Sequence, residues 1–253
     1  MSGGSGLHFY VVDDYRDTVL DTGAGEGDDE ADAVITNLGF YALGENSGID
    51  WLYFNPSLLG IDLEERASAG FGNSRNNYIS GNDHQNILDG RTGDDLIDSY
   101  GGNDLLKGGA GNDALGGGDG FDVVRGQDGE DTVLGDTGRD ILIGGRGADL
   151  FEFRSLGEID VIRRGDGATA FEGAGSAAGD RIFLPNQGED GEFIDRDTVH
   201  FGDTEEGGVT FVERGENTLL RFNVDGDPDL EFKALIEDGA VRADQYTFDD
   251  ILV

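Results

Sequence analysis

The stretch "GGDGFDVVRGQDGEDTVLGDTGRD" (117–140) places an aspartate at positions 122, 131 and 140, with a glycine two residues before each one. A carboxylate therefore returns every nine residues, in a segment that has no cysteine and few bulky apolar side chains. The same period extends outward without a gap from Gly72 to Glu152, which makes nine consecutive rows. Such an array indicates a solenoid in which each row is one structural unit.

Every row has an apolar residue at its eighth position, and we expect these residues to line the interior. The fourth and sixth positions read Gly-x-Asp in the last seven rows, whereas the first two rows carry Arg75 with Asn77 and His84 with Asn86. Each row therefore predicts a glycine-rich turn of about six residues and a strand of about three, so that two rows make one coil. The interior residues are Ile79, Leu88, Ile97, Leu106, Leu115, Val124, Val133, Leu142 and Phe151.

Stacking brings carboxylates of successive coils close together. With coils about 4.8 Å apart, neighbouring charges repel by roughly 0.9 kcal/mol in water and ~3.5 kcal/mol at an effective dielectric of 20. One small apolar residue per row could hardly offset this repulsion together with the entropy of ordering the backbone. A dication between neighbours removes the problem. The expected columns are Asp95, Asp113, Asp131 and Asp149 on one side, and Asp104, Asp122 and Asp140 on the other.

Calcium suits these positions best, because it accepts six to eight oxygen ligands in irregular geometry, whereas magnesium requires an octahedron. Zinc is disfavoured by the absence of cysteine and of clustered histidine. We expect about five to seven calcium ions in the rows, with weaker sites at the two asparagines, and further ions in the flanks remain open. The candidate ligand positions are Asn77, Asn86, Gly90, Thr92, Gly93, Asp95, Gly101, Gly102, Asp104, Gly108, Ala110, Gly111, Asp113, Gly117, Asp119, Gly120, Asp122, Gly126, Asp128, Gly129, Asp131, Gly135, Thr137, Gly138, Asp140, Gly144, Arg146, Gly147 and Asp149.

Charge limits the possible partners. The 253 residues include 54 acidic and 17 basic side chains, for a formal charge of -37. Nucleic acids and anionic membranes are therefore not expected partners, because both need clusters of Lys and Arg. No stretch reaches the roughly 20 apolar residues of a membrane span. The hydrophobic share of 36% is nevertheless enough for ordered domains.

Rows such as "GGAGNDALG" (108–116) and "GGRGADLFE" (144–152) match the pattern G-G-x-G-x-D-x-U-x. The chain thereby resembles the RTX family, whose hemolysin-type repeats bind calcium. The resemblance implies an all-β fold, a parallel calcium β-roll of the β-helix or solenoid type, with flanking strands and a C-terminal β closure.

Three parts are expected: a degenerate N-terminal roll or cap over 1–71, the nine rows over 72–152, and a closure over 153–253. The inserts 26–32 and 48–67 depart from the pattern. Within the second, Trp51, Tyr53 and Phe54 are either a ligand platform or core packing.

The segment "DVIRRGDGATAFEGAGSAAGDRIFLP" (160–185) resembles the closing segment of serralysin-type C-terminal domains, with a loop expected over 168–178. The segment 218–236 is similar to the final hairpin of those domains. Its aspartates at 225, 227 and 229 either bind one more calcium or form a plain hairpin turn.

The resemblance also implies export by a type I ABC transporter, which reads an uncleaved C-terminal signal, here the residues 249–253 (DDILV). The expected location is therefore outside a bacterial cell. In a calcium-poor cytoplasm the repelling chain would stay unfolded, and it would order at the higher calcium concentration outside.

Catalysis is not expected. The three histidines are scattered, and neither H-E-x-x-H nor G-x-S-x-G occurs. Abundant carboxylates remove the diagnostic value of any one acidic pair. The alternative to a folding and secretion module is a recognition or adhesin module. Similar modules of mannuronan epimerases contact anionic polysaccharide through basic strips, and the arginines that could do so here, or that merely relieve charge, are Arg125, Arg139, Arg146, Arg163 and Arg164.

Overall fold

The computed structural model describes the whole repeat region and parts of both flanks, and the statements below concern these residues. They are 7–19, 32–45, 48–55, 66–154, 159–163, 165–166, 179–183, 200–201, 208–214, 216–222, 232–237, 245–246 and 250–252.

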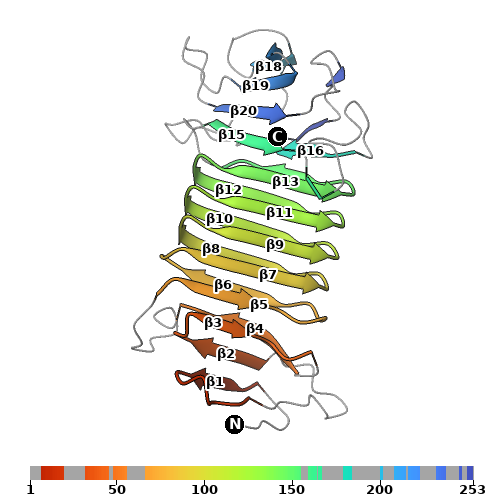
Figure 1. Cartoon of the computed structure of the whole chain (residues 1–253). Coiled ribbons are helices and arrows are strands. Elements are labelled where there is room, and N and C mark those ends of the chain that lie inside the picture. Colours follow the sequence, from red (N-terminus) through yellow and green to blue (C-terminus); the bar gives the residue numbers. More distant parts are fainter. Residues whose placement is uncertain are drawn as a thin grey trace.

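Two stacked sheets form the molecule, and the chain alternates between them from one row to the next (Figure 1). The ten-stranded sheet contains, in spatial order, β1 (Phe9–Val12), β2 (Asp32–Thr36), β4 (Ile49–Tyr53), β6 (Tyr78–Asn82), β8 (Leu96–Gly102), β10 (Ala114–Gly120), β12 (Thr132–Gly138), β14 (Leu150–Glu152), β16 (Arg181–Phe183) and β21 (Ile251–Leu252). The eleven-stranded sheet contains β17 (His200–Phe201), β18 (Gly208–Arg214), β19 (Asn217–Phe222), β20 (Phe232–Glu237), β15 (Ile159–Arg163), β13 (Ile141–Arg146), β11 (Val123–Asp128), β9 (Leu105–Ala110), β7 (Asn86–Thr92), β5 (Ser68–Phe71) and β3 (Phe40–Ala42).

Parallel pairing in the repeat region follows the nine-residue period. Leu115 of β10 pairs with Ile97 of β8 on one side and with Val133 of β12 on the other. Val124 of β11 pairs with Leu106 and Leu142 in the same way. Partners are thus two rows apart, and the prediction of an all-β parallel roll with two rows per coil is confirmed.

The core is one file of apolar side chains between the two sheets. All nine eighth-position residues are buried, and Leu115 is the most exposed of them at 3%. The file continues into the flanks through Leu52 and Phe54 on the N-terminal side and through Ile162 and Ile182 on the C-terminal side. Because each row contributes a single interior residue, the core is narrow along its whole length.

Strands β1 to β5 continue the two sheets upstream, with a bulge between Asp32 and Ala33 where β2 meets β4. Phe54 packs in the core, whereas Trp51 and Tyr53 stay partly exposed. Of the two expected inserts, 26–31 and 56–65 lie outside the described residues. The boundaries at 71 and 152 stay predictions.

At the opposite end, β20 pairs in parallel with β15 and antiparallel with β19, which in turn pairs antiparallel with β18. Strand direction thus changes at the last coil of this sheet, where the roll closes (Figure 1). The loop over 168–178 and the aspartates at 225, 227 and 229 lie outside the described residues.

The turns bring successive backbones into close contact. Gly111 has a φ of +133°, and a Cβ placed on it would come within 2.0 Å of the carbonyl oxygen of Gly93. The second position of the turn is more tolerant, because Arg91, Tyr100, Gln127 and Asp136 adopt positive φ there. In the seven Gly-x-Asp rows the fourth position therefore needs glycine for both conformation and space.

We predict that Gly111→Ala destabilises the calcium-loaded fold by about 1–3 kcal/mol, because it combines backbone strain with a backbone clash. Gly116→Ala is the matched control, since its Cβ would meet its nearest atom, Asp98 Oδ1, at 3.8 Å. Urea unfolding at saturating calcium measures both variants. Equal stability of the two would contradict this account of the turn.

Candidate metal centre

The seven aspartates of the Gly-x-Asp rows lie at the junction of turn and strand, each directly before a strand of the roll. All seven are at most 3% exposed. Their backbone stays in the sheet ladder: for example, the carbonyl of Asp95 accepts from the amide of Ala114 at 2.8 Å. The fold therefore holds seven carboxylates in dry positions, which is costly unless each is compensated.

One oxygen of each carboxylate joins neighbouring coils. The backbone N–H of Asp95 donates to Oδ1 of Asp113 at 2.8 Å, and the N–H of Asp113 donates to Oδ1 of Asp131 at 2.9 Å. In the other column the N–H of Asp104 donates to Oδ1 of Asp122 at 2.8 Å. Our picture of two carboxylates directly sharing one ion thus needs refinement, because Oδ1 is already held by the preceding coil.

The columns extend past the nine rows at the C-terminal side. The N–H of Asp140 donates to Oδ1 of Asp160 at 2.8 Å, and that of Asp149 donates to Oδ1 of Asp180 at 2.8 Å. Sequence reasoning missed these two column members because they follow at separations of 20 and 31 residues instead of 18. The available signal was that Asp160 and Asp180 each stand two residues before an isoleucine, which is the spacing between the sixth and eighth positions of a row.

The second carboxylate oxygen has a different environment. For five aspartates Oδ2 is buried and accepts no hydrogen bond from any described residue. Such an atom carries the full cost of desolvation unless a cation binds it. These five residues are Asp95, Asp104, Asp113, Asp122 and Asp131.

A glycine provides the space around this oxygen. A Cβ on Gly90 would lie 2.2 Å from Oδ2 of Asp95 and 2.8 Å from the carbonyl oxygen of Gly108. A Cβ on Gly126 would likewise lie 2.2 Å from Oδ2 of Asp131 and 2.6 Å from the carbonyl oxygen of Gly144. At Gly90 and Gly126, which are the first residues of their rows, a carboxylate oxygen of the same row and a carbonyl oxygen of the next coil therefore converge on the space that a side chain would fill. This all-oxygen set fits calcium.

Burial raises the pKa of the carboxyls of Asp95, Asp104 and Asp131 to about 7, and hydrogen bonds from backbone N–H groups lower it in part. The pKa values of Asp113 and Asp122 rise to about 6 for the same reason. Without a cation, these buried carboxyls thus keep their protons up to about pH 6 to 7, well above the range in which an exposed aspartate ionises.

The other ligand candidates contribute in different ways. Carbonyl oxygens at the third position lie in the turn, where Ala110 and Arg146 accept the amides of Gly93 and Gly129 at 2.9 Å each. The side chain of Asp128 is exposed and lies 3.5 Å from Arg146, while Thr137 donates to exposed Asp119. No three Asp, Glu, His or Cys side chains converge on one point within the described ranges. Any ion in the roll therefore depends on backbone carbonyls as well.

Ser99 occupies the first position of its row, where the later rows have glycine. Its hydroxyl donates to the carbonyl oxygen of Gly117 at 2.5 Å and also lowers the pKa of Asp104 in part. The carbonyl oxygen of Gly117 is equivalent to that of Gly108 beside Asp95, so the serine hydroxyl takes up an oxygen that could otherwise face an ion. Ser99 is visible in the sequence as a departure from glycine, but it was not among our predicted ligand positions.

The two asparagine rows satisfy their polar groups internally. Oδ1 of Asn77 accepts the N–H of Asn73 at 2.8 Å, and Oδ1 of Asn86 accepts the N–H of Asn82 at 2.9 Å. The amide nitrogen of Asn77 donates to the carbonyl of Asp50 at 3.3 Å. Calcium at Asn77 and Asn86 stays a prediction, and a neutral amide already partnered in this way would bind it weakly.

Comparison with known proteins agrees with this geometry. Residues 71–151 match the model of the RTX calcium-binding nonapeptide repeat in four copies, at 71–97, 80–115, 89–124 and 116–151. The fold and the oxygen-lined turns define a calcium-binding β-roll. This segment thus carries RTX calcium-binding nonapeptide repeats, and calcium is the ion that such repeats bind.

Among solved structures, 34 chains match. One is a subunit of the mannuronan C5-epimerase of Azotobacter vinelandii, with 25% identity and a TM-score of 0.39, over 59% of this chain and 77% of that one. Another is the extracellular lipase of Serratia marcescens, with 15% identity and a TM-score of 0.25, over 89% of this chain and 45% of the lipase. No curated protein sequence matches the chain.

In the described ranges, none of the elements is a helix long and apolar enough to cross a membrane.

Replacing one buried carboxylate tests the centre directly. Asp113→Asn should reduce the number of bound calcium ions and raise the calcium midpoint of folding several-fold, because the neutral amide is a weaker ligand than the carboxylate. Glu130→Gln, an exposed residue of the same segment, makes the same change in charge and should leave both quantities nearly unchanged. Calorimetric titration measures them, and equal behaviour of the two variants would contradict the assignment.

The raised pKa values give a pH dependence for the metal-free chain. A carboxyl whose pKa is higher in the folded state stabilises that state when protonated, so its contribution is complete below about pH 4 and is lost as the pH rises through 6 to 7. In chelator, β structure measured by circular dichroism should therefore increase from pH 8 to pH 5.5. A signal that does not change across this range would show that the carboxyls are not buried in the metal-free fold.

Proposed function

We propose that this chain is the calcium-dependent folding and secretion module of an exported bacterial protein. One observation carries the proposal: five buried carboxylate oxygens accept no hydrogen bond within the described part of the chain, and four of them lie directly beside a glycine that leaves space around the oxygen. RTX repeat proteins are typically extracellular, where calcium is abundant. Calcium binding would then supply the free energy that the narrow core cannot.

The charge explains why folding would wait for calcium. A formal charge of -37 opposes compaction of the free chain. Calcium ions bind the folded chain and not the unfolded one, so folding follows the calcium concentration by mass action. In a calcium-poor cytoplasm the chain would stay extended and could be threaded through a transporter.

A type I ABC machine is the proposed exporter, with the segment 249–253 as its signal. In the folded roll, Ile251 and Leu252 form β21 and pair with Ile182 and Phe183 of β16. Their backbones are then part of the sheet, so the segment would be readable only before the roll forms. Unfolding before export and folding after it are thus compatible with one signal.

We do not propose catalysis, because the site is built from ion ligands and the RTX repeat is a non-catalytic module. Anionic polysaccharide is also a weak candidate for the arginines. Arg125 pairs with Asp166 and Arg163 pairs with Glu237 at 2.7 Å, so these side chains relieve charge within the fold. Arg139 is exposed, and Arg164 lies outside the described residues.

Calcium titration tests the folding half of the proposal. We expect a cooperative rise in the β signal of the metal-free chain with calcium and none with equal magnesium, because magnesium keeps its waters and requires octahedral geometry. A gradual change, or an equal response to both ions, would refute calcium-coupled folding.

Secretion is tested separately in a bacterial strain that carries a type I transporter. The full chain should reach the medium, and a chain lacking residues 249–253 should stay in the cell. Exchange of Glu130 for Gln is the control for expression. Equal export with and without the last five residues would exclude them as the signal while leaving calcium-coupled folding standing.

A further inference from the structure

The outer face of the ten-stranded sheet carries a surface that calcium binding does not use. Two lines of side chains cross its strands, because the seventh and ninth positions of each nonapeptide row point away from the core. Residues that pair between neighbouring strands form the first line, and the second line runs parallel to it two residues later on each strand. The first line contains Trp51, Tyr78, Leu96, Ala114 and Thr132, and the second contains Tyr53, Ser80, Asp98, Gly116, Leu134 and Glu152.

Aromatic rings form the N-terminal part of this surface. The ring centroids of Trp51 and Tyr53 are 6.3 Å apart and those of Tyr53 and Tyr78 are 5.5 Å apart, with the rings edge to face. All three side chains are partly exposed. Burial and the neighbouring Tyr100 raise the pKa of Tyr78 to about 12, so its hydroxyl stays protonated and can donate. Ser80, which pairs with Tyr53 on the neighbouring strand, is fully buried and has a hydroxyl without a hydrogen-bond partner within the described residues.

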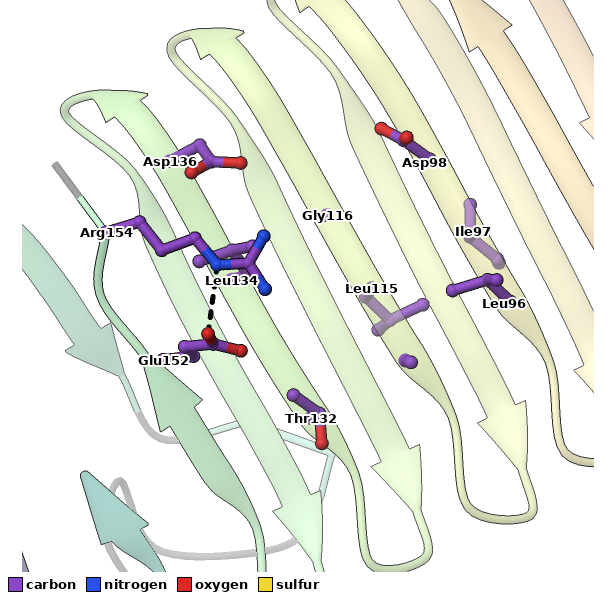
Figure 2. Close-up of a pocket in the computed structure, with 11 residues that line it drawn as sticks. Leu96, Ile97, Asp98, Leu115, Gly116, Thr132, Leu134, Asp136, Glu152 and Arg154 are labelled. Atoms are coloured by element: carbon purple, nitrogen blue, oxygen red, sulfur yellow. Dashed lines mark hydrogen bonds and ion pairs between the residues drawn. The ribbon is translucent and has the colours of Figure 1, made fainter. Parts of the chain in front are cut away.

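Beside the aromatic rings the surface is hollow. Ala114 and Gly116 of β10 leave a depression of about 190 Å³, shown in Figure 2, between Leu96 of β8 and Leu134 of β12. A Cβ on Gly116 would have only one neighbour within 4 Å, Asp98 Oδ1 at 3.8 Å, so the depression is open space and not a packed contact.

Polar groups line the far side of the depression. Arg154 donates from Nε to Oε1 of Glu152 at 2.9 Å and lies over Leu134, on the strand that also carries Asp136 (Figure 2). Burial raises the pKa of Asp98 and Asp136, and the charge of Arg154 lowers both in part. The depression thus offers carboxylate acceptors and guanidinium donors beside an apolar floor.

We propose that this surface, the outer-face groove from Trp51 to Arg154, binds a neutral polysaccharide. Pyranose rings present C–H groups on their faces and hydroxyls around their edges. Aromatic rings suit the faces, because their π-systems are negative on the face, and carboxylates with an arginine suit the hydroxyls. The depression is smaller than the roughly 300–1,000 Å³ of a pocket for a whole small ligand, so it takes one ring of a longer chain that lies across the strands.

Charge and composition select this occupant over the two main alternatives. A polyanion would meet Asp98, Asp136 and Glu152 on a chain of charge -37, with only Arg154 to oppose them within the groove. A protein interface is depleted of carboxylates at its centre, whereas here they line the depression. A neutral sugar needs neither charge compensation nor removal of the acidic side chains from water.

Sugar binding by the groove would be a function in addition to calcium-coupled folding and secretion. It rests on the proposed function only because the groove exists in the folded roll. Within the rows the residues of the groove lie mainly at positions seven and nine, with Asp136 at position two, while the buried oxygen at each calcium position belongs to position six. A change in the groove can therefore remove sugar binding without removing calcium binding.

The test is affinity electrophoresis of the full chain in calcium, through gels that contain hydroxyethylcellulose, xyloglucan, galactomannan or dextran, with alginate as the anionic comparison. We expect retardation in at least one neutral polymer and none in alginate. Gly116→Leu should fill the depression and weaken binding at least about tenfold, a loss of roughly 1.4 kcal/mol. Tyr53→Ala should weaken it in the same direction.

Lys107→Leu is the matched control, because it adds the same side chain to the outer face of the opposite sheet, on β9. Circular dichroism in calcium shows whether each variant folds, which separates failure of this proposal from failure of calcium-coupled folding. Retardation only in alginate, no retardation in any neutral polymer, or equal binding by folded Gly116→Leu and wild type would overturn the proposal. A change in sedimentation of Gly116→Leu from dimer to monomer would instead assign the groove to a second copy of the chain.

Discussion

The two oxygens of each repeat aspartate have different partners, and the structure of the roll depends on this difference. Oδ1 accepts the backbone N–H of the aspartate one coil earlier, as Asp131 does for Asp113 at 2.9 Å, and this bond fixes the distance between coils. Oδ2 is left buried beside a glycine with no protein donor. The first bond joins successive coils, and the second oxygen remains without compensation for its desolvation unless a cation binds it. One carboxylate thus accounts both for the stacking of the coils and for the calcium dependence that we propose.

The two ends of the columns show how this arrangement stops. Upstream, Asn77 and Asn86 keep the bonds to Asp95 and Asp104 through their backbone N–H groups but use their own amide oxygens for local turns. The charge is removed there, and so is the need for an ion. Downstream, Asp160 and Asp180 continue the columns into the closing strands, although the sequence between rows has lengthened.

Much of the fold was predictable because the period of nine constrains both sheets at once. The interior file from Ile79 to Phe151 and the two columns follow from counting positions. The separate uses of Oδ1 and Oδ2 could not be predicted, because they depend on how far one coil is shifted against the next. Nor could the outer-face groove, since Gly116 looks like any repeat glycine until Trp51, Tyr78 and Leu96 are aligned beside it.

The central claim concerns a metal ion at Oδ2, and a crystal structure of the chain grown in calcium tests it most directly. Anomalous difference density should show an ion about 2.3–2.6 Å from Oδ2 of Asp113 or Asp131. The same ion should contact a glycine carbonyl oxygen of the neighbouring coil. Density that shows these two oxygens bound only to protein atoms or water, in a folded roll with calcium present, would contradict the account.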